Sequence, residues 1–252
     1  MKDPKLILVG AGPGDPELLT LKAVKALHTA DVILYDALVN IELLNHAPAD
    51  AERIFVGKRK GCYAYQQDQI NELIVQRAKS KGTVVRLKGG DPFIFGRGSE
   101  EMEYAQRYGV PSELIPGISS CMAVPALQHI PLTKRGVSES FWVITGTTKS
   151  HKLSNDVHLA AKSNATVVIL MGTAKLDEII ALYKAEHKND LPVAIIQNGT
   201  RSFEKIGIGT VASISKIYKE QHLGNPAIIV LGEVVNNRKQ MQEVIAQTAA
   251  SI

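Results

Sequence analysis

The order of apolar segments constrains the fold of this 252-residue chain more than any other feature. In the first half, apolar runs of strand length alternate with segments of helical character. The predicted strands are residues 5–10, 32–35, 53–56 and 83–87, and the helical segments between them are residues 16–29, 41–46 and 66–81. A further helix is predicted to begin near residue 98 and to end at residues 109–111. This alternation is typical of a parallel sheet covered by helices, so an α/β layer structure is predicted.

The second half follows a different order, with two consecutive strands and no helix between them. Strands are predicted at residues 140–145, 166–171, 192–197, 204–210 and 227–231, and helices at 119–128, 174–186, 211–221 and 234–246. The turn at Gly199 and Thr200 joins neighbouring strands, which favours some antiparallel pairing. Because the pattern changes near residues 112–118, two α/β domains are predicted, residues 1–114 and residues 115–252 with a mixed sheet.

Composition excludes several classes of protein. With 45% hydrophobic and 21% charged residues, the chain has the balance of an ordinary globular protein. Its longest apolar runs, at residues 166–171 and 226–231, are far shorter than the roughly 20 residues of a membrane helix. The start of the chain lacks a signal-peptide cleavage pattern, so a cytoplasmic protein that does not bind a membrane is expected.

The distribution of charge and the spacing of the cysteines limit the classes of ligand that the chain is expected to bind. Residues 1–126 carry 15 basic and 15 acidic side chains, so the formal charge of +4 comes from the second half, with 14 basic and 10 acidic. These basic residues are scattered, which argues against a nucleic-acid partner and fits either an acidic small-molecule ligand or a solvated surface. Cys62 and Cys121 have no Cys-x-x-Cys spacing, so neither a disulfide framework nor a metal site is expected.

Glycine-rich turns follow two of the predicted strands. The first, at residues 10–14, departs from the dinucleotide-binding spacing, and its Pro13 removes a backbone donor that a pyrophosphate would use. The second, at residues 88–98, is richer in glycine, and its Asp91 can accept hydrogen bonds from a ligand or cap the turn. Open α/β sheets bind ligands at the carboxyl ends of their strands, so both turns are candidate ligand-binding loops.

The second turn contains the sequence Asp-Pro-Phe-Ile-Phe-Gly-Arg-Gly at residues 91–98, which belongs to an ordered set of short motifs. The set comprises residues 9–16, 35–36, 38–39, 56–59, 66–71, 86–98, 115–120, 130–133, 145–146, 171–172, 198–200 and 226–227. In these motifs and over essentially its whole length, the chain resembles the uroporphyrinogen-III C-methyltransferases of the tetrapyrrole methylase family. The resemblance implies two α/β domains of the tetrapyrrole methylase type, with the active site in the cleft between them.

The resemblance also implies a cofactor and a set of residues that bind it. The cofactor is S-adenosylmethionine, with S-adenosylhomocysteine as its product and no metal. The positions carried over for its binding are Pro13, Gly89, Gly90, Asp91, Ile94, Ser119, Ser120, Met171, Gly199 and Ala227. From the residues alone, Ile94 and Met171 are interpreted as core side chains, whereas the glycines let backbone groups reach a ligand directly. Family members are typically homodimers, so the resemblance implies a homodimer here.

Asp36 and Lys58 match positions to which the family assigns proton acceptance and proton donation, respectively. Each directly follows a predicted strand or its closing glycine, so both lie at the same rim of one predicted sheet. The residues alone also allow a turn aspartate and a surface lysine. The implied reaction moves two methyl groups to ring carbons 2 and 7 of uroporphyrinogen III. It gives precorrin-2 by way of precorrin-1, for sirohaem or cobalamin synthesis.

Basic residues near the site are expected to bind the eight carboxylates of the implied substrate. The candidates are Arg59, Arg97, Lys134 and Arg135. The family commonly has histidine where this chain has Lys134, which puts a proton-transfer role at that position in doubt. Two other readings stay open: a methylase of the same fold that acts on a later precorrin, a protein or a ribosomal RNA base, and a catalytically silent binding module for a small molecule or nucleotide.

Overall fold

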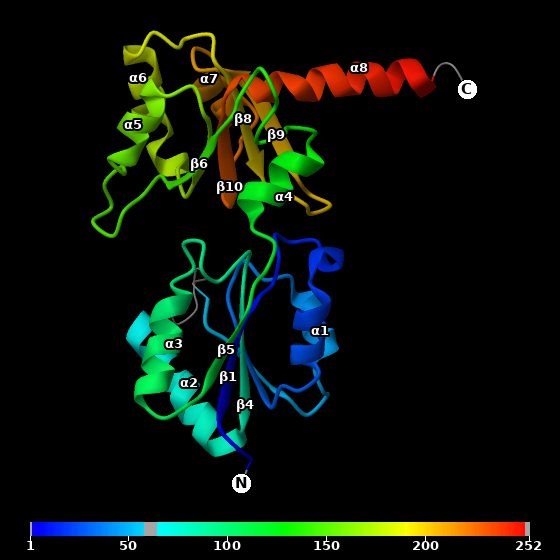
Figure 1. Cartoon of the computed structure of the whole chain (residues 1–252), viewed down its shortest axis with the longest axis vertical. Coiled ribbons are helices and arrows are strands. Elements are labelled where there is room, and N and C mark those ends of the chain that lie inside the picture. Colours follow the sequence, from blue (N-terminus) through cyan, green and yellow to red (C-terminus); the bar gives the residue numbers. More distant parts are fainter. Residues whose placement is uncertain (1, 58–64, 250–252) are drawn as a thin grey trace. The chain divides into compact units, whose positions relative to one another are not determined.

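The computed structural model describes residues 2–57 and 65–249, and the chain divides into two compact units, Met1–Ser119 and Ser120–Ile252 (Figure 1). Each unit contains one five-stranded sheet. The boundary drawn from the sequence, between residues 114 and 115, falls inside a strand of the first sheet, Ser112–Ile115. Within the described residues, no helix combines the length and apolar character that a membrane crossing requires.

The sheet of the first unit is parallel throughout its described pairings, as the alternating pattern predicts. Its strands are β1 (Lys5–Gly10), β2 (Val32–Tyr35), β3 (Glu52–Phe55), β4 (Thr83–Lys88) and β5 (Ser112–Ile115), in the order β3-β2-β4-β1-β5. The edge strand β5 is absent from the strands predicted from sequence, because only Leu114 and Ile115 of its four residues are apolar. The carboxyl ends of all five strands share one edge of the sheet.

Helices cover both faces of this sheet. They are η1 (Pro16–Leu18), α1 (Leu21–Leu27), η2 (Ile41–His46), α2 (Gln67–Lys81) and α3 (Gly98–Arg107), where η denotes a 3-10 helix. The prediction of one helix over residues 16–29 is wrong: Leu19 is extended, and the Thr20 side chain caps α1 by accepting the Ala23 N–H at 3.2 Å. α1 lies on one face of the sheet, and α2 and α3 lie on the other (Figure 1).

The alternation of side chains along β1 and β4 decides which residues each face receives. Ile7 and Val9 pack with α1, and Leu6 packs with α2 on the opposite face. On β4, Val84 belongs to the face of α2 and α3. Arg86 and Lys88 follow it at spacings of two and are buried, so they must place charges beneath α2 and α3.

The second unit holds a mixed sheet, in the order β6-β7-β10-β8-β9. Its strands are β6 (Phe141–Thr145), β7 (Thr166–Leu170), β8 (Pro192–Gln197), β9 (Lys205–Thr210) and β10 (Ala227–Leu231). β6 and β7 are parallel, whereas β10 is antiparallel to β7 and β8. The antiparallel pairing of β8 with β9, predicted from the missing helix between them, is confirmed.

The helices of the second unit are α4 (Ser120–Leu127), α5 (Asp156–Lys162), η3 (Thr173–Lys175), α6 (Leu176–Ala185), α7 (Ile214–Glu220), η4 (Glu233–Asn236) and α8 (Asn237–Ala249). α5, α6 and α7 pack on one face of the sheet, and α4 and η4 pack on the other. Along α8, the side chains of Met241, Val244 and Ile245 are exposed. α5 is absent from the helices predicted from the sequence.

Candidate active site

The two glycine-rich turns of the first unit are joined by backbone hydrogen bonds at the carboxyl edge of its sheet. Gly90 N–H donates to the Gly12 carbonyl at 2.7 Å, and Gly12 N–H donates to the Gly90 carbonyl at 3.2 Å. Gly12 has φ +75° and Gly90 has φ +67°, values that glycine adopts without steric cost. The loops after β1 and β4 therefore form one structure, which includes Pro13, Gly89 and Gly90 from the predicted cofactor site.

A third loop, at residues 115–119, is tied to the other two by Asp91. Asp91 Oδ1 accepts the Phe93 N–H at 2.8 Å, which closes a turn, and Asp91 Oδ2 accepts the Gly117 N–H at 3.0 Å. A Cβ on Gly117 would lie 2.3 Å from the Gly90 carbonyl oxygen, so a side chain there would separate the loops. Asp91 is thus a turn cap that also holds the loop leading to Ser119, which is buried.

Backbone strain marks the segment between Asp91 and α3. Phe95 and Arg97 have φ values of 54° and 59°, which are uncommon outside glycine. The Arg97 guanidinium donates to both oxygens of Glu100, at 2.9 and 2.6 Å, and this contact raises its pKa. Ile94 is exposed rather than part of the core, so its apolar surface is open to a ligand.

Asp36 directly follows β2 at the same edge of the sheet. Its Oδ1 accepts the Leu38 N–H at 3.0 Å, and its side chain is 23% exposed. Oδ2 lies 3.8 Å from Nη2 of Arg86. The other predicted catalytic residue, Lys58, and the predicted substrate-binding residue Arg59 lie outside the described residues.

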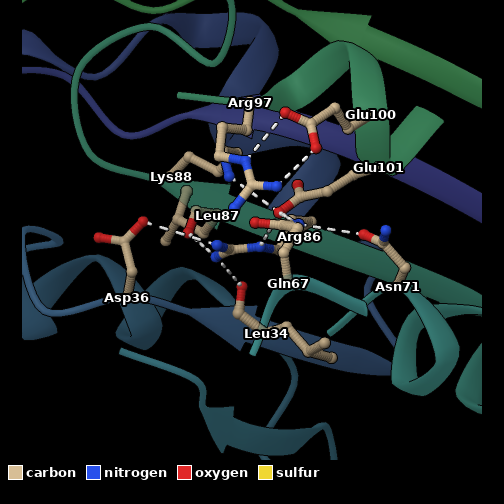
Figure 2. Close-up of polar contacts among 10 residues, drawn as sticks. All are labelled: Leu34, Asp36, Gln67, Asn71, Arg86, Leu87, Lys88, Arg97, Glu100 and Glu101. Atoms are coloured by element: carbon tan, nitrogen blue, oxygen red, sulfur yellow. Dashed lines mark hydrogen bonds and ion pairs between the residues drawn. The ribbon is translucent and has the colours of Figure 1, made fainter. Parts of the chain in front are cut away.

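Arg86 belongs to a cluster of charged side chains beneath α2 and α3 (Figure 2). The Glu101 carboxylate, fully buried, accepts hydrogen bonds through Oε1 from Arg86 Nε at 3.3 Å and from Lys88 Nζ at 2.9 Å. Gln67 Nε2 donates to the same oxygen at 3.1 Å. Arg86 and Lys88 are only 4% and 6% exposed, so two cations share one buried carboxylate.

Burial and charge oppose each other in this cluster. Burial alone would raise the pKa of the Glu101 carboxyl, but Arg86 and Lys88 outweigh it and hold that pKa below its usual value. Burial, followed by repulsion from Arg86, lowers the pKa of the Lys88 ammonium. Attraction to Glu101 and Asp36 offsets only part of this lowering. Because Asp36 acts on Lys88 electrostatically, the cluster reaches the edge of the sheet.

The predicted cofactor residues of the second unit also share one edge of a sheet. Met171 follows β7, Gly199 follows β8, and Ala227 begins the antiparallel strand β10, so the three meet at the same end. Met171 is exposed and has φ 55°, and its carbonyl accepts a hydrogen bond from the Thr147 hydroxyl at 2.9 Å. A Cβ on Gly199 would lie 2.4 Å from the Val124 side chain of α4, which explains the glycine by packing.

Ser120 begins α4, and two predicted substrate-binding residues lie further along the second unit. Lys134 Nζ donates to Asn237 Oδ1 at 2.8 Å and to Gln240 Oε1 at 3.1 Å, so it links its turn to α8 through neutral partners. Arg135 is exposed. Among the described residues, no group of three or more His, Cys, Asp or Glu side chains could hold a metal ion.

Sequence reasoning did not assign roles to Arg86, Lys88, Glu101 or Gln67. A signal was present, because two basic residues interrupt an otherwise apolar strand at positions that share a face. Buried charges need partners, so this pattern predicts an acidic residue on a covering helix. Which acidic residue is chosen depends on helix placement, which the pattern alone does not give.

Comparison with known proteins establishes the family. The family model for Tetrapyrrole (Corrin/Porphyrin) Methylases matches residues 5–215. The chain belongs to the tetrapyrrole methylase family.

Relatives of known name extend this match. The uroporphyrinogen-III C-methyltransferase of Methanocaldococcus jannaschii is 47% identical over 234 residues, covering 92% of this chain and 97% of that protein. A siroheme synthase of Pectobacterium atrosepticum is 43% identical, and this chain spans only 53% of its length. The structure of the Thermus thermophilus uroporphyrin-III C-methyltransferase in complex with S-adenosyl homocysteine gives a TM-score of 0.80 at 36% identity, covering 92% of this chain and 99% of that one. The fold of a tetrapyrrole methylase predicted from the sequence is confirmed.

Proposed function

We propose that this chain is an S-adenosylmethionine-dependent uroporphyrinogen-III C-methyltransferase. The observation that carries the proposal is the 47% identity to the Methanocaldococcus jannaschii enzyme, which extends over nearly the whole of both chains. The proposed reaction transfers methyl groups to ring carbons 2 and 7 of uroporphyrinogen III. Its product is precorrin-2, formed by way of precorrin-1, a precursor of sirohaem and cobalamin.

The residues at the two sheet edges fit S-adenosylmethionine. In the first unit, linked glycine loops bring backbone groups to the carboxyl edge, and Ile94 offers exposed apolar surface. In the second unit, exposed Met171 offers a polarisable apolar side chain beside Gly199 and Ala227. We assign cofactor binding to these residues together with Pro13, Gly89, Gly90, Asp91, Ser119 and Ser120. When bound, S-adenosylmethionine supplies an electrophilic methyl group on its sulfonium sulfur.

The residues of the chain have two tasks in this reaction. The binding loops orient the methyl group toward a pyrrole carbon, and orientation of this kind is worth effective molarities of about 10⁵–10⁸ M. Asp36 stabilises the positive charge that develops on the methylated ring, or accepts the proton that the ring then loses. Lys58 is the proposed proton donor. The carboxylate of Asp36 is partly exposed at the sheet edge, where a substrate can reach it.

The substrate of the proposed reaction is an octacarboxylate, for which we assign Arg59, Arg97, Lys134 and Arg135. Arg135 is exposed, and the Lys134 side chain donates to the neutral amides of Asn237 and Gln240. Arg97 is paired with Glu100, so a substrate carboxylate would compete with an existing ion pair. Arg135 and Lys134 therefore offer more to a carboxylate than Arg97 does.

A label-transfer assay tests the function. The purified chain is incubated anaerobically with uroporphyrinogen III and S-adenosylmethionine that carries a labelled methyl group. Two labels per tetrapyrrole are expected in wild type, and Asp36→Asn is expected to lower turnover by about 10²-fold. Binding of S-adenosylhomocysteine without any transfer of label would favour a catalytically silent binding module instead.

We further propose that the protein is cytoplasmic and, as the family resemblance implies, a homodimer. Exposed Met241, Val244 and Ile245 on α8 are apolar surface that a second copy could cover. Sedimentation velocity at assay concentrations tests the dimer, and a monomer would contradict it. Cell fractionation tests the location.

A further inference from the structure

The Arg86 side chain is fixed on several sides in the interior of the first unit. Its Nε donates to Glu101 at 3.3 Å, and its Nη1 donates to the carbonyls of Leu87 at 2.9 Å and Leu34 at 3.4 Å. Leu34 lies on β2, so the guanidinium bridges β4, β2 and α3 (Figure 2). An arginine held by this many partners has little freedom to reorient.

The remaining end of this guanidinium faces Asp36. Nη2 lies 3.8 Å from Asp36 Oδ2, and the other carboxylate oxygen accepts the Leu38 N–H. Each oxygen of Asp36 therefore has one contact, an ion pair with the buried Arg86 and a hydrogen bond from its own turn. This arrangement leaves the partly exposed carboxylate with one favoured orientation.

Charge balance also links Asp36 to the buried cluster. Arg86 and Lys88 carry two positive charges against the single negative charge of buried Glu101. Asp36 supplies the second negative charge, and it acts on Lys88 as well as on Arg86. Glu101 Oε2 has no hydrogen-bond partner within the described part of the chain, so this carboxylate is directed at the two cations through one oxygen.

We propose that Arg86 is the positioning residue for Asp36, and that Glu101 holds Arg86 in place for this task. The proposal rests on the proposed function, in which Asp36 acts on the methylated ring. A buried ion pair of this kind is weak support for stability, because apolar side chains of similar size often replace such pairs without loss. Positioning of the Asp36 carboxylate gives the Arg86–Glu101 ion pair a role other than stability.

The test compares Arg86→Lys with the matched variant Arg77→Lys. Arg77 contacts both oxygens of Glu52 through Nε at 3.1 Å, near the amino ends of the strands and therefore at the opposite end of the sheet from Asp36. Lysine keeps the charge but cannot reach Glu101, the two carbonyls and Asp36 together. Arg86→Lys is expected to lower kcat by roughly 10- to 100-fold, with KM for both substrates within about twofold of wild type. Arg77→Lys is expected to leave both constants unchanged.

A double-mutant cycle separates positioning from a general loss of structure. If Arg86 acts through Asp36, then Asp36→Asn should have a much smaller effect in the Arg86→Lys enzyme than in wild type. Effects that multiply would overturn the proposal, as would wild-type kcat for Arg86→Lys while Asp36→Asn is impaired. Wild-type turnover of Asp36→Asn would instead remove Asp36 from the proposed function and the Arg86 proposal with it.

Thermal melting would reveal whether Arg86→Lys misfolds, and two further variants test the proposal in that case. Glu101→Gln keeps the size of the side chain and removes the charge that holds Arg86, so it should show the same dependence on Asp36. Asp36→Glu changes only a partly exposed position, keeps the charge and displaces the carboxylate from Nη2. It is expected to lower kcat by roughly tenfold or more, and an unchanged kcat would overturn the proposal.

Discussion

Lys88 shows at the scale of one residue how the interior of the first unit handles charge. It ends β4 on the face that also carries apolar Val84 and charged Arg86, and its ammonium is buried against Glu101 at 2.9 Å. Burial and the neighbouring Arg86 lower the pKa of the Lys88 ammonium. Arg86 and Lys88 together lower the pKa of the Glu101 carboxyl. The cluster therefore favours the ionised form of Glu101 and disfavours the protonated form of Lys88. The two pKa shifts make opposite contributions to the stability of the folded chain.

Replacing Lys88 with methionine is expected to change how stability depends on alkaline pH. The pKa of Lys88 is lowered in the folded chain and returns to about 10.5 on unfolding, so between these values the unfolded chain binds more protons. The free energy of unfolding contributed by Lys88 therefore rises with pH in this window. In urea unfolding from about pH 8 to about pH 10.5, the free energy of unfolding of wild type should increase relative to that of Lys88→Met. A parallel pair of curves would contradict this, and Lys79→Met, an exposed change on α2, is the control.

At the scale of elements, the prediction from sequence succeeded where the apolar pattern was long or regular. The parallel strands β1, β2 and β4 were found because each is a mostly apolar run, and the long helix α2 was found because its pattern extends over several turns. The pattern failed over η1 and α1, where Thr20 starts a new helix inside an apparently continuous one. The failure has a physical reason, since a cap acts through one side chain and leaves the periodicity of its neighbours unchanged.

The positions of the glycine-rich loops could be predicted from the sequence, but the contacts between them could not. Glycines placed at strand ends indicated the loops, and the roles of Asp36, Lys58 and the cofactor residues came from the family resemblance. Asp91 could be a ligand contact or a cap by sequence; one of its two backbone hydrogen bonds is local, and the other depends on Gly117, 26 residues away. Contacts between such distant loops follow from packing, which no local pattern contains.

Replacing Gly117 with alanine is expected to separate the linked loops. The added Cβ would lie 2.3 Å from the Gly90 carbonyl oxygen and 2.7 Å from Gly10 Cα, so backbone must move. We expect a loss of about 1–3 kcal/mol in the free energy of unfolding, the usual cost of overpacking. Affinity for S-adenosylhomocysteine, measured by calorimetry, should fall as well. Gly224→Ala is the control, because its Cβ would lie 3.7 Å from its nearest neighbour, and equal effects of both variants would contradict the expectation.

At the scale of the whole molecule, the proposed binding residues lie at the strand ends of both sheets, one set in each unit. The two units differ in charge as well as topology. The excess of basic residues lies in the second half of the sequence, which also contains Lys134 and Arg135. An octacarboxylate substrate would be attracted by that excess over distances of about a Debye length, roughly 8 Å at physiological ionic strength. Binding of the substrate should then depend on salt more strongly than binding of S-adenosylhomocysteine.

The contribution of Lys134 to this attraction can be measured separately. Lys134→Ala is expected to raise KM for uroporphyrinogen III by about two- to fivefold at low salt and to change kcat less, as for a partly exposed ion pair. The increase should shrink as salt is added, because screening removes the same interaction from wild type. Lys134 also donates to Asn237 on α8, so Asn237→Ala tests whether the effect comes from that contact. If Asn237→Ala raises KM equally, or if the Lys134→Ala effect is independent of salt, then Lys134 acts through α8 and not through its charge.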